Sequence, residues 1–93
     1  MIAVTRMVLD VLKPMTPSLM EFATRLCSIK GINQVECTIL EIDRETETIK
    51  IILEGDDLQY PVIEDVIASL GAAVHSIDSI TARRSPERHK KPS

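Results

Sequence analysis

The spacing of apolar residues switches along this chain between every second residue and every third or fourth, and the order of these switches constrains the fold most strongly. Four segments alternate between apolar and polar residues, as strands with unequal faces do: residues 2–12, 33–42, 48–54 and 75–82. Two intervening segments carry a helical stripe, from Leu19 to Ile29 and from Leu58 to Leu70. The predicted order is therefore strand, helix, strand, strand, helix, strand.

This order is that of a ferredoxin-like, split βαβ arrangement of the α+β class. Right-handed crossovers place both helices on one face of a four-stranded antiparallel sheet, with the first and third strands at its centre. We expect one domain over residues 1–83, followed by a basic, polar tail over residues 84–93 whose composition cannot bury enough apolar surface to order itself.

Capping residues predict where the helices begin and end. Thr16 or Ser18 can accept hydrogen bonds at the start of the first helix, and Gly31 stands where a left-handed residue would end it. We expect Asp56 or Asp57 to cap the second helix in the same way.

Composition excludes several classes of partner. The 93 residues include one Phe, one Tyr and no Trp, so the core must be aliphatic. Residues 83–93 carry five of the eleven Lys and Arg residues and one of the fourteen acids, which leaves residues 1–82 strongly acidic. An acidic body is a poor match for phosphates, so we expect no nucleic-acid binding. No apolar run approaches the roughly 18 residues of a membrane span, and the chain reads as a cytoplasmic protein without a membrane partner.

The two cysteines do not indicate redox or zinc chemistry. Cys27 and Cys37 form no CxxC pair and have no nearby His. We expect both to be small buried hydrophobic residues.

The acidic segment EIDRETE, residues 41–47, raises the question of a calcium loop. Such a loop needs Gly at its sixth position and Glu at its twelfth, where this chain has Thr46 and Ile52. We therefore interpret the segment as a solvated hairpin between two strands, with its acids, Glu47 among them, in water.

A different group of carboxylates is the candidate metal site. If the first and third strands are parallel neighbours, Asp10 comes near Glu54, and the fourth strand brings Asp78 to the same end. Three carboxylates without partners would favour a hard cation, Ca²⁺ or Mg²⁺. Arg6 or Lys50 of a neighbouring subunit would neutralise the cluster equally well. His75 is not part of this candidate site, because alternation along the strand places its side chain on the face opposite to that of Asp78.

The face of the sheet that no helix covers predicts self-association. We expect apolar side chains on this face, namely Val4, Val8, Leu12, Leu40, Ile52 and Ile80. Large apolar patches are seldom left in contact with water. The economical partner is a second copy of the chain, which makes a homo-oligomer the expected state.

Three blocks, VLDVLKP (8–14), ETETIKIILEG (45–55) and HSID (75–78), resemble in order and spacing the mostly archaeal family called domain of unknown function 211. The resemblance covers residues 2–82. It implies the ferredoxin-like fold, assembly into rings of subunits and, for some members, calcium binding. It implies no enzymatic activity and no particular binding residues.

Other users of this fold fit the sequence less well. Copper chaperones need CxxC where this chain has KPMTPS, and RNA-recognition domains need aromatic residues on their central strands. Regulatory amino-acid-binding domains of the ACT type remain an alternative, because the turn from Gly31 to Val35 is similar to theirs. The sequence favours a non-enzymatic, self-assembling domain that binds a hard cation or a small ligand at a subunit interface.

Overall fold

The computed structural model describes residues 1–84, and the tail predicted over residues 84–93 lies outside that range except for Arg84. The elements are β1 (Ile2–Pro14), α1 (Leu19–Cys27), β2 (Ile32–Ile42), β3 (Thr46–Gly55), α2 (Tyr60–Ser69) and β4 (Ala73–Arg84). Their order confirms the predicted one. No helix within the described residues is long and apolar enough to cross a membrane.

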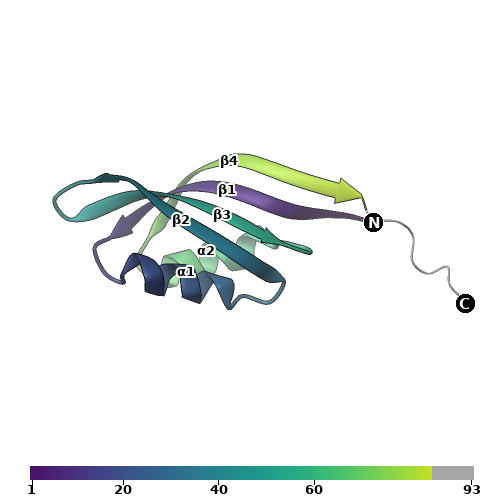
Figure 1. Cartoon of the computed structure of the whole chain (residues 1–93), viewed down its shortest axis with the longest axis horizontal. Coiled ribbons are helices and arrows are strands. Elements are labelled where there is room, and N and C mark those ends of the chain that lie inside the picture. The colour runs from purple at the N-terminus through teal and green to yellow at the C-terminus, as the bar shows by residue number, and fades with distance from the viewer. Residues whose placement is uncertain (85–93) are drawn as a thin grey trace, which may run out of the picture.

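The four strands form one sheet in the order β2-β3-β1-β4, and every neighbouring pair is antiparallel. Both helices lie on the same side of this sheet (Figure 1), which confirms the ferredoxin-like α+β fold. The central position of β1 and β3 is confirmed as well. Their predicted parallel pairing is wrong, because β3 follows β2 through a hairpin and runs back against β1.

The core fills the space between the helices and one face of the sheet. Its central residues are fully buried and almost entirely aliphatic: Leu9 and Val11 of β1, Ile49, Ile51 and Leu53 of β3, Phe22 and Leu26 of α1, and Ile63 and Ile67 of α2. These residues recur with the predicted strand and helix periods. Alternation of polarity therefore determines which face of each central strand meets the helices.

The predicted start of α1 is confirmed, but its predicted end is not, because α1 ends at Cys27 with Ser28 as its C-cap, before the chain reaches Gly31. The Ser18 hydroxyl accepts the Glu21 amide at 3.1 Å, and Gly31 and Gly71 follow the two helices with φ of 93° and 84°. The prediction for α2 is wrong, because its N-cap is Gln59, with no side-chain cap, and a proline occupies its first turn. Proline lacks one of the amides that a cap would satisfy.

Irregular register moves some side chains from one face of the sheet to the other. Thr5 has no partner in β4, and the adjacent Val4 packs against the core instead of lying on the uncovered face. Further shifts leave His75 and Asp78 of β4 without partners in β1. As a result Ile80 pairs with buried Met7 on the helix side, also contrary to the prediction.

We call the uncovered side of the two central strands the open face. Its residues are Arg6, Val8, Asp10 and Leu12 of β1, and Thr48, Lys50, Ile52 and Glu54 of β3. The β1–β4 pair extends past the helices (Figure 1). On the helix side of the edge strand β4, Ile77 and Ile80 are about half exposed, opposite Leu9 and Met7 of β1. The open face is accordingly more polar than predicted, with an apolar centre between charged side chains.

Candidate functional site

The three predicted metal ligands do not meet in one copy of the chain. The antiparallel register places Asp10 opposite Lys50, and Glu54 opposite Arg6, which comes four residues before Asp10 in β1. Glu54 is instead an ion-pair partner, with Oε2 3.4 Å from Nε of Arg6. Within the described residues there is no group of three His, Cys, Asp or Glu side chains arranged to hold a metal ion.

Asp10 and Asp78 do approach one another through Ser76. Ser76 lies directly opposite Asp10 in the β1–β4 register, and its hydroxyl donates a 2.7 Å hydrogen bond to Oδ1 of Asp78. Their spacing makes this possible, because side chains two positions apart in a strand lie on the same face of the sheet. Two of the predicted carboxylates therefore share a neighbourhood, and Glu54 belongs to another.

One carboxylate oxygen on the open face lacks a partner. Oδ1 of Asp10 is buried and accepts no hydrogen bond in the described structure. Nearly all buried polar atoms in proteins are satisfied, so each exception calls for a cation, a donor or a water that completes it. Lys50, opposite Asp10, forms no ion pair with it within the described residues.

A second charged site, which the sequence reasoning missed, lies inside the core. Nζ of Lys13 is 3.0 Å from Oε1 of Glu47, and it also donates to the carbonyl oxygen of Pro14 at 2.8 Å. Lys13 is fully buried and Glu47 nearly so, which shows that the predicted exposure of Glu47 is wrong. Lys13 follows Leu9 and Val11 at every second position of β1, and Glu47 precedes Ile49 and Ile51 in the same way in β3. This spacing in the sequence could have predicted that both charged side chains point into the core.

Cys37 lies near this pair and is chemically quiet. Burial, and to a lesser extent the neighbouring carboxylate of Glu36, raise the pKa of its thiol to about 11, although Lys13 acts in the opposite direction. A thiol in this state is a poor nucleophile at neutral pH. The prediction of two buried cysteines fails for Cys27, which is exposed at the end of α1.

The hairpin interpretation of EIDRETE is confirmed in its main part. β2 ends at Ile42 and β3 begins at Thr46, with the Asp43 amide donating 2.8 Å to the carbonyl oxygen of Thr46. The Asp43 carboxylate accepts the next amide, that of Arg44, at 2.8 Å. The acids of this turn, apart from Glu47, are solvent-exposed and form no cage.

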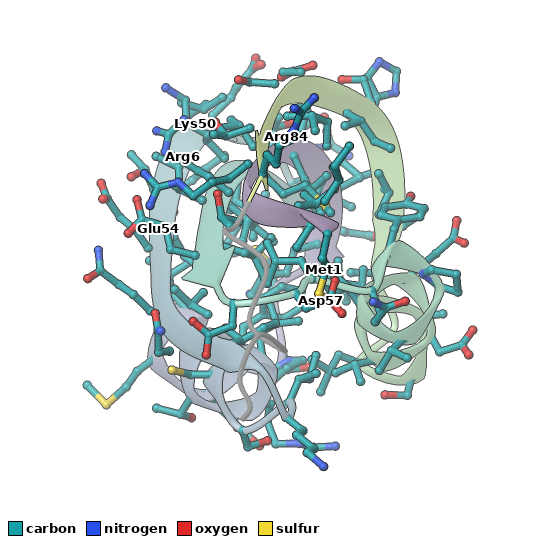
Figure 2. All side chains as sticks on the ribbon, turned by 90° about the vertical axis from the view of Figure 1, so that its right-hand side faces the viewer. Met1, Arg6, Lys50, Glu54, Asp57 and Arg84 are labelled. Carbon is teal, nitrogen blue, oxygen red and sulfur yellow. The ribbon has the colours of Figure 1, made fainter. Side chains whose placement is uncertain are left out.

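A third feature is a groove of about 770 Å³ where β1 begins and β3 ends. Its lining includes Ala3, Arg6, Glu54, Asp56, Asp57 and Arg83. Figure 2 views this end of the molecule, with Arg6 and Glu54 together on one side and Asp57 near Met1. We call it the end groove. No pattern in the sequence indicates this groove, because it results from the unequal lengths of β1 and β3.

Comparison with known proteins places these features in a family context. Residues 5–86 match the model of the family DUF211, described as uncharacterized ArCR. An uncharacterized protein of Methanocaldococcus jannaschii is 43% identical over 79 residues, a match that covers 85% of this chain and 81% of that protein.

Proposed function

Because the chain belongs to the DUF211 family of uncharacterized proteins, we propose a function from its geometry, namely self-association through the open face of the sheet. The observation that carries this proposal is the buried, unsatisfied Oδ1 of Asp10 on a face that no helix covers. A second copy supplies what one copy lacks. The proposed role is binding and assembly rather than catalysis.

The composition of the open face supports this pairing. Its apolar centre contains Val8, Ile52 and the 46%-exposed Leu12, and it is flanked by both signs of charge. In a two-fold interface each copy presents the same surface, so a cation of one copy can meet an anion of the other. Lys50 of one copy is then a natural partner for Asp10 of the next.

The sheet edges are less suited to association than this face. β4 pairs irregularly with β1 at Asp78 and His75, and β2 pairs irregularly with β3 next to Leu40. Such interruptions are a common means of preventing edge-to-edge strand pairing. A face-to-face contact therefore explains the molecule better than an extended sheet.

A matched pair of substitutions tests the surface. Leu12 on the open face and Val62 on α2 are 46% and 47% exposed, respectively. We expect Leu12→Lys to lower the sedimentation mass, whereas Val62→Lys retains that of the wild type. An Ile80→Lys variant tests the exposed apolar surface on the helix side of β4. Loss of assembly by Ile80→Lys but not by Leu12→Lys would place the interface on the helix side and overturn the proposal.

A hard cation is the alternative to Lys50 of the second copy as the group that completes Asp10 at this interface. Asp10 and Asp78 flank Ser76 in one copy, and an acid of a second copy would complete an oxygen-only ligand set of the kind that Ca²⁺ and Mg²⁺ favour. The competing role is that of an ACT-like module that binds an amino acid. Thermal unfolding with Ca²⁺, Mg²⁺ and a panel of amino acids separates them, since a ligand stabilises the form that it binds.

A further inference from the structure

Four charged residues alternate in sign over the open face. Arg6 lies opposite Glu54 in the β1–β3 register, and Asp10 lies opposite Lys50. Each of them therefore has the opposite charge beside it both across the two strands and along its own strand. Figure 2 shows Arg6, Lys50 and Glu54 together on one side of the molecule. We call these four residues the charge square.

The charge square suits a second copy of the same face better than a surface of one sign. A partner with only positive or only negative groups would oppose two of the four residues, and like charges in contact disfavour association. A copy related by a two-fold axis can present an anion to each cation. This requires the axis to pass through the centre of the square, where Val8 and Ile52 are direct partners. An axis along either strand, or level with either charged pair, would place charged residues against their own equivalents.

Two axes through this centre remain, one along the strands and one across them. The first lays β1 of one copy over β3 of the other, so that Asp10 meets Lys50 across the interface. The second lays each strand over its own equivalent in the reverse direction, so that Asp10 meets Arg6 instead. The partner of Asp10 in the second copy thus distinguishes the two orientations.

The ion pairs within one copy favour the axis along the strands. Oδ1 of Asp10 is buried without a hydrogen bond, and Lys50 makes no ion pair with any residue that the structure describes. Arg6 already has a partner, since its Nε lies 3.4 Å from Oε2 of Glu54. The axis along the strands joins the two residues that lack a partner. The axis across the strands would make Arg6 serve two carboxylates.

The exposed Leu12 favours the same axis. It lies one pair beyond Asp10, opposite Thr48, and is 46% exposed. With the axis along the strands, Leu12 lies against Thr48 and beside Leu12 of the other copy, which buries its apolar surface. With the axis across the strands, it lies level with Val4 of the other copy, which packs against its own core. Leu12 then has no apolar partner.

We propose that two copies pair about a two-fold axis that runs along the strands between β1 and β3, with Asp10 of each copy meeting Lys50 of the other. This orientation rests on the proposed self-association through the open face, and it specifies the partner and the register. Arg6 meets Glu54 at the other end of the charge square. The two sheets form a sandwich with nearly aligned strands, a usual arrangement of sheets packed face to face.

Mixing two charge variants tests the orientation. Asp10→Lys brings like charges together when two copies of that variant pair, and so does Lys50→Asp. We expect each variant alone to associate about tenfold more weakly than the wild type, or weaker still, in sedimentation. An equimolar mixture should recover most of the wild-type affinity, because the introduced lysine meets the introduced aspartate. A fluorophore on exposed Cys27 of one variant, in α1 on the other side of the sheet, identifies the mixed species.

The second charged pair provides an independent version of the test. Arg6→Glu and Glu54→Arg should each weaken association, and their mixture should restore it. Circular dichroism checks that every variant folds. The second pair keeps the orientation testable if Asp10→Lys or Lys50→Asp does not fold.

The axis across the strands predicts a different mixture. Asp10 then meets Arg6, so Arg6→Asp rather than Lys50→Asp would rescue Asp10→Lys. Rescue by Arg6→Asp, or by neither variant, would overturn the orientation if the wild type assembles, and Leu12→Lys decides separately whether the open face is the interface. A wild type that stays monomeric would overturn the self-association on which the orientation rests.

Discussion

The ammonium group of Lys13 lies 3.0 Å from Oε1 of Glu47, on the face of the sheet that the helices cover. The two residues are direct partners in the β1–β3 register, so the hydrogen-bonded ladder itself positions the pair. Lys13 also donates to the carbonyl oxygens of Pro14 and Met15, where β1 leaves the sheet. Its ammonium group thus ties the end of β1 to the start of β3.

Removing one member of this pair should destabilise the fold strongly. Lys13→Met leaves the Glu47 carboxylate buried without its cation, and we expect a loss of about 3–5 kcal/mol in the free energy of unfolding. Lys13→Met/Glu47→Leu removes both charges and should recover most of that loss. Urea unfolding measures both, and single and double variants that lose equal amounts would show that the pair is not coupled.

Gly55 should tolerate substitution less well than Gly71. A Cβ at position 55 would collide with the carbonyl oxygen of Gly31, which is backbone and cannot move aside. At Gly71 the obstacle is its φ of 84°, a conformation that costs an ordinary residue about 1–2 kcal/mol.

Thermal unfolding should therefore rank Gly55→Ala as more destabilising than Gly71→Ala, and Gly71→Asn as the mildest, because Asn adopts positive φ more easily. The reverse order for the two alanine variants would contradict the close contact between Gly55 and Gly31.

Cys37 predicts a loss of stability at alkaline pH. Its pKa is about 11 in the folded protein against 9.0 for an ordinary thiol, so the unfolded chain releases this proton first. The contribution of this thiol to the free energy of unfolding is complete below pH 9 and is lost between pH 9 and 11. We expect the stability of the wild type, measured relative to Cys37→Ser, to decline across that interval. A constant difference from pH 8 to 11 would show that burial does not hold the thiol protonated.

The proposed cation site predicts which carboxylates matter. At a Ca²⁺ concentration 100 times its dissociation constant, binding adds about 2.7 kcal/mol, or a rise of roughly 10–20 °C in the melting temperature of a domain of this size. Asp10→Asn and Asp78→Asn should each abolish most of that rise. Glu54→Gln should retain it, because Glu54 faces Arg6. An equal loss in all three variants would instead support the three-carboxylate site predicted from the sequence.

The sequence predicted the fold because each element carries its own periodicity, and the buried faces of β1 and β3 follow from alternation alone. It did not predict the register. Thr5, His75 and Asp78 interrupt the β1–β4 pairing without any distinctive residue type, and they place Val4 and Ile80 on the other side.

The predicted metal site was wrong in placing Glu54 beside Asp10, and the physical reason is the direction of β3. A hairpin after β2 makes β3 antiparallel to β1, so residues that would be close in a parallel pair lie four positions apart along β1. The buried pair of Lys13 and Glu47 could have been predicted, because both residues occupy the alternate positions of their strands that face the core. The general exposure of charged residues argued against it.

The mass of the full chain in solution, measured by light scattering across a concentration series, tests self-association most directly. Self-association through the open face should give a multiple of the 10.4 kDa chain mass, with dissociation only on dilution. A single species of 10.4 kDa at every concentration up to about 100 µM would contradict self-association, because an interface with a micromolar dissociation constant is mostly formed at that concentration.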